Sequence, residues 1–167
     1  IAGQFPAAKV ERLDFDTART RTAYERIISD FEKGKTQILI GTQMLSKGLD
    51  FGNVSVVGIL SADSLMNFPD FRAHERAYQL MVQVSGRAGR RDKRGTVILQ
   101  TTQPEHPLIR MVQHFAYKEM VSLQLSERSM FRYPPYYRLI VIVLRSRNDS
   151  VLQELSVLYA ENLRRRL

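Results

Sequence analysis

The hydrophobic pattern of the chain changes period several times, and each change predicts a switch between strand and helix. Residues 9–15 (KVERLDF) alternate apolar and polar side chains, as a half-buried strand does. Residues 20–33 repeat apolar side chains at helical spacing, and Gly34 is suited to ending that helix. The predicted inner face of the helix consists of Tyr24, Ile27, Ile28 and Phe31.

The same alternation continues further along the sequence. Short apolar runs predict three more strands, at residues 37–41, 53–61 and 95–101. Helical patterns occupy residues 71–84 and 106–128, and the second is predicted as one long helix. Strands that alternate with helices indicate an α/β fold, in which a parallel sheet has helices on both faces. In such sheets ligands bind beyond the carboxyl ends of the strands, so the loops there are the first places to look for chemistry.

Two consecutive prolines in residues 133–138 (YPPYYR) predict a domain boundary, because proline cannot continue the preceding helix. A strand at residues 138–146 and an amphipathic helix at residues 148–166 are expected beyond it. The tyrosines beside the prolines could stack on nucleic-acid bases or pack the joint between domains, and we expect the packing role. The predicted limits are 1–105 for the first domain, 106–132 for a connecting helix and 133–167 for the start of a small α+β domain.

Charge adds a class of partner to this picture. The 167 residues include 25 Lys and Arg against 17 Asp and Glu, which gives a net charge of +8. A basic excess of this size favours a polyanionic partner, usually nucleic acid, over a generic soluble surface. No apolar run approaches the roughly 20 residues of a membrane span and no signal peptide is visible, so we expect no membrane contact. The absence of cysteine fits a cytoplasmic protein, which is the location we expect. The sequence starts at Ile1, and we expect it to be a piece of a longer protein.

The loop after the second predicted strand, TQMLSKGLDF, contains the first group of polar candidates. Thr42 and Gln43 leave the strand end, where a hydroxyl and backbone N–H groups can hold a phosphate. Lys47 adds a cation, Gly48 permits a turn or a close approach, and Asp50 can accept from a ribose hydroxyl or orient a cation. Taken alone, the pattern is equally typical of an ordinary loop between a strand and a helix.

A second group of candidates lies at the end of the helix predicted at residues 71–84, in the sequence QVSGRAGR. Arg87 and Arg90 each follow a glycine, although glycine weakens a helix. The glycines would let the segment pack closely on a neighbouring surface, so that both arginines project into a site shared with another domain. An arginine that reaches a transferring phosphate can raise the rate by about 10³–10⁵. The alternative, a solvated basic helix end, leaves Gln83 and both glycines unexplained.

In these two segments the chain resembles a known group of proteins. GTQMLSKGLDF is similar to motif V of the superfamily 2 helicases, and QVSGRAGR is similar to motif VI. The stretches RLDFDT, SADSLMNFPDFRAHERAYQL, TTQPEHPLI and YPPYYRLIVIVLRS extend the resemblance over nearly the whole chain, to the primosomal protein N′ (PriA) family of replication-restart helicases. The resemblance implies a RecA-like second helicase lobe of the P-loop NTPase type, followed by the start of a carboxyl-terminal domain.

The resemblance also implies roles for the candidate residues. Those expected on the DNA side are Thr42, Gln43 and Lys47. Those expected at the nucleotide are Gly48, Asp50, Gln83, Arg87 and Arg90, with Arg87 and Arg90 as catalytic arginine fingers. The family unwinds DNA with 3′-to-5′ polarity and uses ATP. It acts in replication restart and primosome assembly, with DNA forks, single strands, primosome proteins and single-strand-binding protein as partners.

Some features of the family are missing from this sequence. It has neither a GxxxxGK[ST] phosphate loop nor an acidic Mg²⁺ motif, so most ligands of ATP and Mg²⁺ would lie on a first lobe outside it. It has no cysteine, so the zinc that the family binds through cysteines is expected only outside it. We therefore expect half of an ATPase, inactive by itself. The alternatives are another superfamily 2 DNA translocase and a non-catalytic basic module that binds nucleic acid.

Acidic side chains and one histidine follow the strand predicted at residues 53–61. Asp63, Asp70 and Glu75 could meet the first lobe or the loops on the DNA side, and His74 could form a hydrogen bond across that interface. For Asp70 we expect the more ordinary role, as the N-cap of the next helix.

Overall fold

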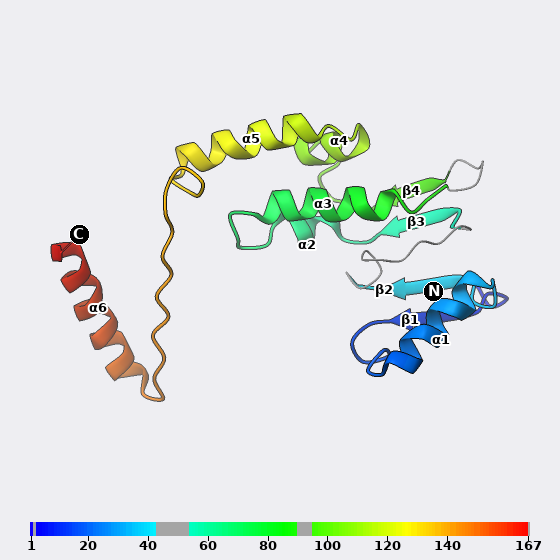
Figure 1. The fold of residues 1–167 in the computed structure, drawn as a ribbon, viewed down its shortest axis with the longest axis horizontal. Coiled ribbons are helices and arrows are strands. Elements are labelled where there is room, and N and C mark those ends of the chain that lie inside the picture. Colours follow the sequence, from blue (N-terminus) through cyan, green and yellow to red (C-terminus); the bar gives the residue numbers. More distant parts are fainter. Residues whose placement is uncertain (2, 43–53, 90–94, 167) are drawn as a thin grey trace. The chain divides into compact units, whose positions relative to one another are not determined.

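The fold is that of a computed structural model, which describes residues 1, 3–42, 54–89 and 95–166 (Figure 1). The chain divides into two compact units, Ile1–Glu127 and Arg128–Leu167. Most of the residues predicted as a connecting helix therefore belong to the first unit.

The first unit starts with a strand–helix–strand element. Strands β1 (Val10–Leu13) and β2 (Ile38–Gly41) pair in parallel, with Leu13 opposite Gly41. Helix α1 (Arg21–Glu32) connects them. The Thr20 side chain accepts a hydrogen bond from the first turn of this helix, as an N-cap does. Gly34 follows with a φ of 72°, the left-handed conformation that glycine adopts most easily.

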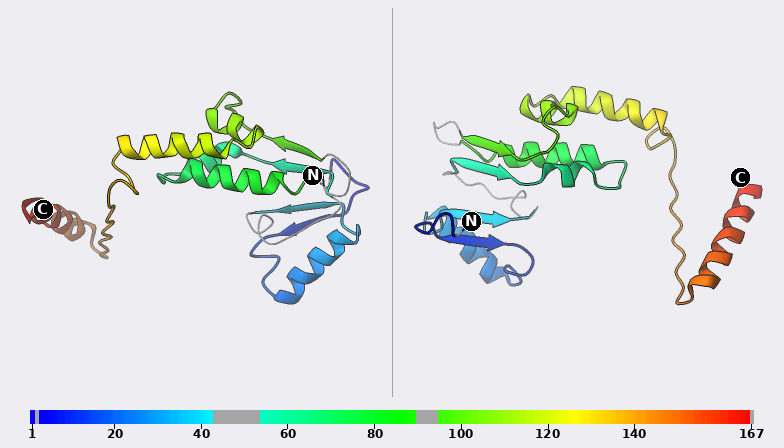
Figure 2. Two further views of the ribbon diagram at one scale, coloured as in Figure 1. Left: turned by 45° about the horizontal axis from the view of Figure 1, so that its top comes forward. Right: turned by 180° about the vertical axis from the view of Figure 1, so that it is seen from behind.

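A second parallel pair carries the rest of the unit. Strands β3 (Val56–Ile59) and β4 (Thr96–Leu99) pair in register. Between them lie α2 (Ala62–Met66), a short helix that the hydrophobic pattern did not predict, and α3 (Ala73–Ser85). Figures 1 and 2 show α3 extending mainly past the ends to which the arrows of these strands point, next to α2.

Two hydrophobic clusters hold these elements together. The smaller one joins β1 to α1 through Leu13, Ile27 and Ile28. The larger one joins β3 and the helices α2 and α3 to the two helices that follow, and its buried members are Ile59, Ala62, Met66, Ala77, Tyr78, Met81, Leu108, Ile109, Val112 and Met120. Parallel strands alternating with covering helices confirm the predicted α/β class.

The long helix predicted at residues 106–128 is wrong, because the structure divides it in two. Helices α4 (Pro107–Gln113) and α5 (Tyr117–Met130) are separated by Phe115, whose φ of 52° does not fit a right-handed helix. Both helices contribute buried residues to the same core.

The second unit consists of the last turn of α5, an extended segment and helix α6 (Asp149–Arg166), which confirms the helix predicted there, although none of its described residues is buried. The strand predicted at residues 138–146 is wrong for the described structure, since these residues pair with no strand in the part of the chain that is described. Their apolar side chains are exposed instead, from Leu139 to Leu144. Among the described helices, none is both long and apolar enough to span a membrane.

Candidate functional site

The carboxyl ends of β1 and β2 form one candidate surface. Thr42 directly follows β2 and is exposed, as a residue that contacts a nucleic-acid backbone must be. The other candidates of this loop lie outside the described residues, namely Gln43, Lys47, Gly48 and Asp50. The structure therefore supports the accessibility of Thr42 and leaves the other four as predictions.

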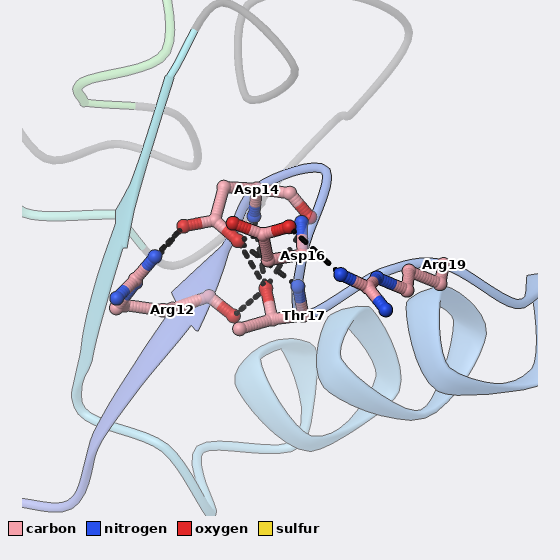
Figure 3. Close-up of polar contacts among 5 residues, drawn as sticks. All are labelled: Arg12, Asp14, Asp16, Thr17 and Arg19. Carbon is pink, nitrogen blue, oxygen red and sulfur yellow. Dashed lines mark hydrogen bonds and ion pairs between the residues drawn. The ribbon is translucent and has the colours of Figure 1, made fainter.

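A hydrogen-bonded turn lies next to Thr42, because the β1–β2 register that pairs Leu13 with Gly41 brings Asp14 to the same sheet edge. The Asp14 carboxylate accepts hydrogen bonds from the backbone N–H of Asp16 at 3.1 Å and of Thr17 at 3.0 Å. In return, the Thr17 hydroxyl accepts from the Asp14 N–H at 3.0 Å. Figure 3 shows Asp16 and Thr17 on one side of the Asp14 carboxylate and Arg12 on the other.

Ion pairs complete this turn, which we call the Asp14 turn (residues 12–19). Arg12 donates from Nε to the second Asp14 oxygen at 2.9 Å and contacts the same oxygen through Nη2. Arg19 pairs with Asp16 at 3.2 Å on the other side. The hydrogen bond from Arg12, together with those from Thr17, lowers the pKa of Asp14 from 3.8 to about 2. Asp14 is therefore ionised at neutral pH and holds Arg12 in place.

The end of α3 and the residues that follow it form a second candidate surface. Gln83 is exposed in the last turns of the helix, and Arg87 follows the helix half-buried, with its Nε buried. The N–H of Gly89 donates to the carbonyl of Val54, which lies just before β3. The last described residue of this segment, Gly89, thus lies beside the amino end of β3. Arg90 lies outside the described residues.

The glycines in this segment and just after it differ in backbone conformation and in how closely they are packed. Gly89 has a φ of 84°, which a residue with a β-carbon adopts at a cost. Gly95 is packed so closely that an added β-carbon would overlap the backbone of Ala88 and Gly89. Gly86 has a φ of −66°, and an added β-carbon would come no closer than 3.6 Å to a neighbour. Close packing of the segment is therefore found at Gly89 and Gly95, while Gly86 has no such role.

Asp63 has hydrogen-bond partners within the unit. Its carboxylate accepts from the Thr101 hydroxyl at 2.6 Å and from the N–H and hydroxyl of Thr102 at 2.9 and 3.1 Å. These bonds, led by that from Thr101, lower the pKa of Asp63. They tie α2 to the residues after β4, so the structure gives Asp63 a structural role.

Asp70 also has partners within the unit. The N-cap predicted at Asp70 is wrong in position, because the cap of α3 is Arg72. The Asp70 carboxylate nevertheless accepts from the Arg72 N–H at 2.8 Å and pairs with Arg76 at 2.8 Å, and the backbone bond from Arg72 leads in lowering its pKa. Both contacts fix the start of α3.

The ring of His74 packs edge-on against His106, with centroids 5.4 Å apart. His106 caps α4, since its Nδ1 accepts from the Leu108 N–H at 3.2 Å. Burial lowers the pKa of His106, and His74 nearby lowers it further. Both histidines thus have partners inside the first unit.

Sequence reasoning assigned no role to the Asp14 turn. The signal that could have found it is Asp followed three positions later by Thr, directly after a predicted strand. Short Asp and Thr side chains form hydrogen bonds to their own backbone and build such turns.

Comparison with protein families gives one match to this part of the chain. Residues 5–92 match the helicase conserved C-terminal domain. The match includes the Asp14 turn, Thr42 and the segment from Gln83 to Arg90.

Comparison with curated proteins finds relatives over most of the chain. The replication restart protein PriA of Synechocystis is 41% identical over 92% of this chain and 18% of its own length. The replication restart protein PriA of Bacillus subtilis is 46% identical over 83% of this chain and 17% of its own length. The chain therefore spans about a fifth of these relatives, and the family resemblance seen in the sequence is confirmed.

Among solved structures, the C-terminal domain of the DEAD-box protein Dbp5 aligns with 68% of this chain and 60% of its own length. The TM-score is 0.49 and the sequence identity is 22%.

Proposed function

The chain belongs to the helicase C-terminal domain family, and we propose that it is the second RecA-like motor lobe of an ATP-dependent 3′-to-5′ DNA helicase that acts in replication restart. In this proposal one edge of the lobe contacts the DNA backbone and the other edge completes an ATP site that a first lobe begins. The observation that carries it is the match of residues 5–92 to a helicase lobe, which contains both groups of candidate residues.

The DNA side of the proposal rests on Thr42. It is exposed at the end of β2, where its hydroxyl and nearby backbone N–H groups can bind a phosphate without reading the base. Gln43 and Lys47 are proposed as its neighbours on the DNA. The net charge of +8 supports this, because a positive field attracts the polyanion whatever its sequence.

The ATP side of the proposal rests on the end of α3. Gln83 is exposed and Arg87 is half-buried on a turn that Gly89 and Gly95 hold close to the body of the unit. An amide and a guanidinium placed this way fit the phosphates of a nucleotide presented by another lobe. Arg87 and Arg90 would stabilise charge on the transferring phosphoryl group, with Gly48 and Asp50 nearby. When bound, ATP would supply the transferable phosphoryl group, and Mg²⁺ would neutralise part of the charge on its phosphates.

The proposed partners follow from the resemblance to the replication-restart helicases. They are DNA forks and single strands, primosome proteins and single-strand-binding protein, in the bacterial cytoplasm. Zinc is proposed only for parts of a longer protein outside this chain. The other candidate function, a basic module without a catalytic role, would place Arg87 and Arg90 on phosphates of nucleic acid and not on ATP.

One experiment on the 167-residue chain tests both sides of the proposal. We expect no DNA-stimulated ATP hydrolysis, because a chain with no phosphate loop cannot hold the ATP phosphates and Mg²⁺. We expect weak binding to single-stranded DNA of any sequence, with an affinity that falls steeply as salt rises, because phosphate contacts release counterions.

A variant with Arg87 and Arg90 both changed to alanine is the control for turnover. Hydrolysis by the unchanged chain above this control would show that the chain makes a complete ATP site, against the proposal. An affinity for DNA that is the same at low and moderate salt would exclude contacts through the DNA backbone.

A further inference from the structure

Phe15 lies at the tip of the Asp14 turn and is 84% exposed. In the described part of the chain, no other large apolar residue has a higher exposed fraction. Single exposed apolar side chains are common on proteins and carry no meaning by themselves. Phe15 differs because the turn that carries it is fixed on both sides.

The residues on either side of Phe15 hold it in place. The Asp14 carboxylate binds the N–H groups of Asp16 and Thr17, so the backbone loops tightly around Phe15. The Thr17 hydroxyl donates to the Arg12 carbonyl at 3.0 Å, which closes the turn back onto β1. An aromatic ring on a fixed turn loses little conformational entropy when a planar partner stacks on it.

The charges around Phe15 cancel. Arg12 is paired with Asp14 and Arg19 with Asp16, so the Asp14 turn has two cations and two anions. A turn without net charge does not attract phosphates strongly. The group that it offers to a partner is therefore the flat apolar ring itself.

The location of Phe15 indicates which partner this is. The β1–β2 register brings the Asp14 turn to the sheet edge where Thr42 is exposed. Thr42 is the residue proposed to contact the DNA backbone. A DNA strand whose phosphates contact Thr42 would therefore bring its bases close to the Asp14 turn.

We propose that Phe15 stacks on a base of the single strand whose backbone contacts Thr42. The inference rests on the proposed DNA contact and deepens it, since it assigns one side chain to the bases and not to the phosphates. Every base has a flat aromatic face, so stacking on Phe15 is independent of sequence. Because stacking releases no counterions, its contribution to affinity does not depend on salt.

A single tryptophan provides a direct test. The chain has no Trp, so Phe15→Trp places one fluorescent indole at the tip of the turn. Titration with single-stranded oligo(dT) is expected to quench this emission, because the indole stacks on a base. An abasic oligonucleotide of the same length, which has the phosphates without the bases, is expected to bind more weakly and to leave the emission nearly unchanged.

Phe15→Ala is expected to weaken oligo(dT) binding by roughly 5- to 150-fold, the range for loss of one base–aromatic stack. The dependence of affinity on salt is expected to stay the same as for the unchanged chain. A merely structural effect of Phe15 on the turn would disturb the phosphate contacts and change this salt dependence. Phe5→Ala is the matched control, because Phe5 is 55% exposed and precedes the amino end of β1.

The remaining outcomes separate this inference from the proposed function. If Phe15→Ala binds as tightly as the unchanged chain, or if the abasic strand quenches the indole emission of the Phe15→Trp variant equally, stacking is wrong while the backbone contact at Thr42 stands. If the unchanged chain binds no single strand at all, the proposed DNA contact fails and the stack fails with it. An indole emission that is blue-shifted without DNA and does not respond to it would show that protein covers this position, and would also overturn the inference.

Discussion

Gly95 is the residue on which the turn beside the proposed ATP side depends most clearly. An alanine there would overlap the backbone of Ala88 and Gly89, so Gly95→Ala is expected to lower the free energy of unfolding by about 1–3 kcal/mol. Gly86→Ala is the control, because Gly86 has an ordinary φ and an added β-carbon would meet its neighbours only at an ordinary contact distance of 3.6 Å. It is expected to be neutral or to raise stability by up to about 1 kcal/mol. Urea denaturation of the 167-residue chain measures both, and equal effects of the two substitutions would contradict the packing described here.

At the scale of the residue, the sequence could predict which residues are candidates for the functional site. It could not predict which contacts hold their side chains in place. Thr42, Gln83 and Arg87 are candidates because of their residue types and their place after predicted elements. The residues near Asp63 in the sequence do not reveal its hydrogen bonds to residues 101 and 102. From the sequence alone, Asp63 is therefore a candidate for an interface. Such bonds join segments far apart in the chain, and only folding brings them together.

The break between α4 and α5 gives a prediction at the scale of the element. Phe115→Gly and Phe115→Ala both remove the same ring, which is 59% exposed. Because residue 115 has a φ of 52°, glycine is expected to be more stable than alanine by about 1 kcal/mol. If residues 106–128 formed one continuous helix, the alanine variant would instead be the more stable one, since glycine costs about 1 kcal/mol relative to alanine inside a helix. Thermal or urea unfolding of the two variants therefore distinguishes the two structures.

The hydrophobic pattern could not reveal this break. Leu108 and Val112 of α4 and Met120 of α5 face the same core, so the apolar spacing continues through the turn between the helices. The strand predicted at residues 138–146 failed for a related reason. Alternating or continuous apolar residues indicate that a segment can form a strand, but a strand also needs a partner for its backbone hydrogen bonds.

At the scale of the whole molecule, the two groups of candidate residues follow different elements of the first unit, β2 and α3. Thr42 and the Asp14 turn lie at the carboxyl ends of β1 and β2, whereas Arg87 follows α3, and Gly89 two residues later donates to the carbonyl of Val54 just before β3. The α/β class could be predicted from the alternation of strands and helices alone. The position of the residues after α3 could not, because it depends on how the chain returns from the end of that helix toward β3.

The central claim is that QVSGRAGR belongs to the ATP side, and Arg90→Ala in a full-length protein that carries this chain tests it most directly. A first lobe also holds ATP, so ATP binding should weaken only modestly. Turnover at saturating DNA and ATP should fall by at least roughly 10²-fold, because the arginine acts mainly on the charge of the transition state. Arg91→Ala, which removes the neighbouring charge, should have a much smaller effect. DNA affinity without nucleotide should be unchanged, whereas normal turnover with lost DNA binding would move this segment from the nucleotide to the DNA and contradict the account.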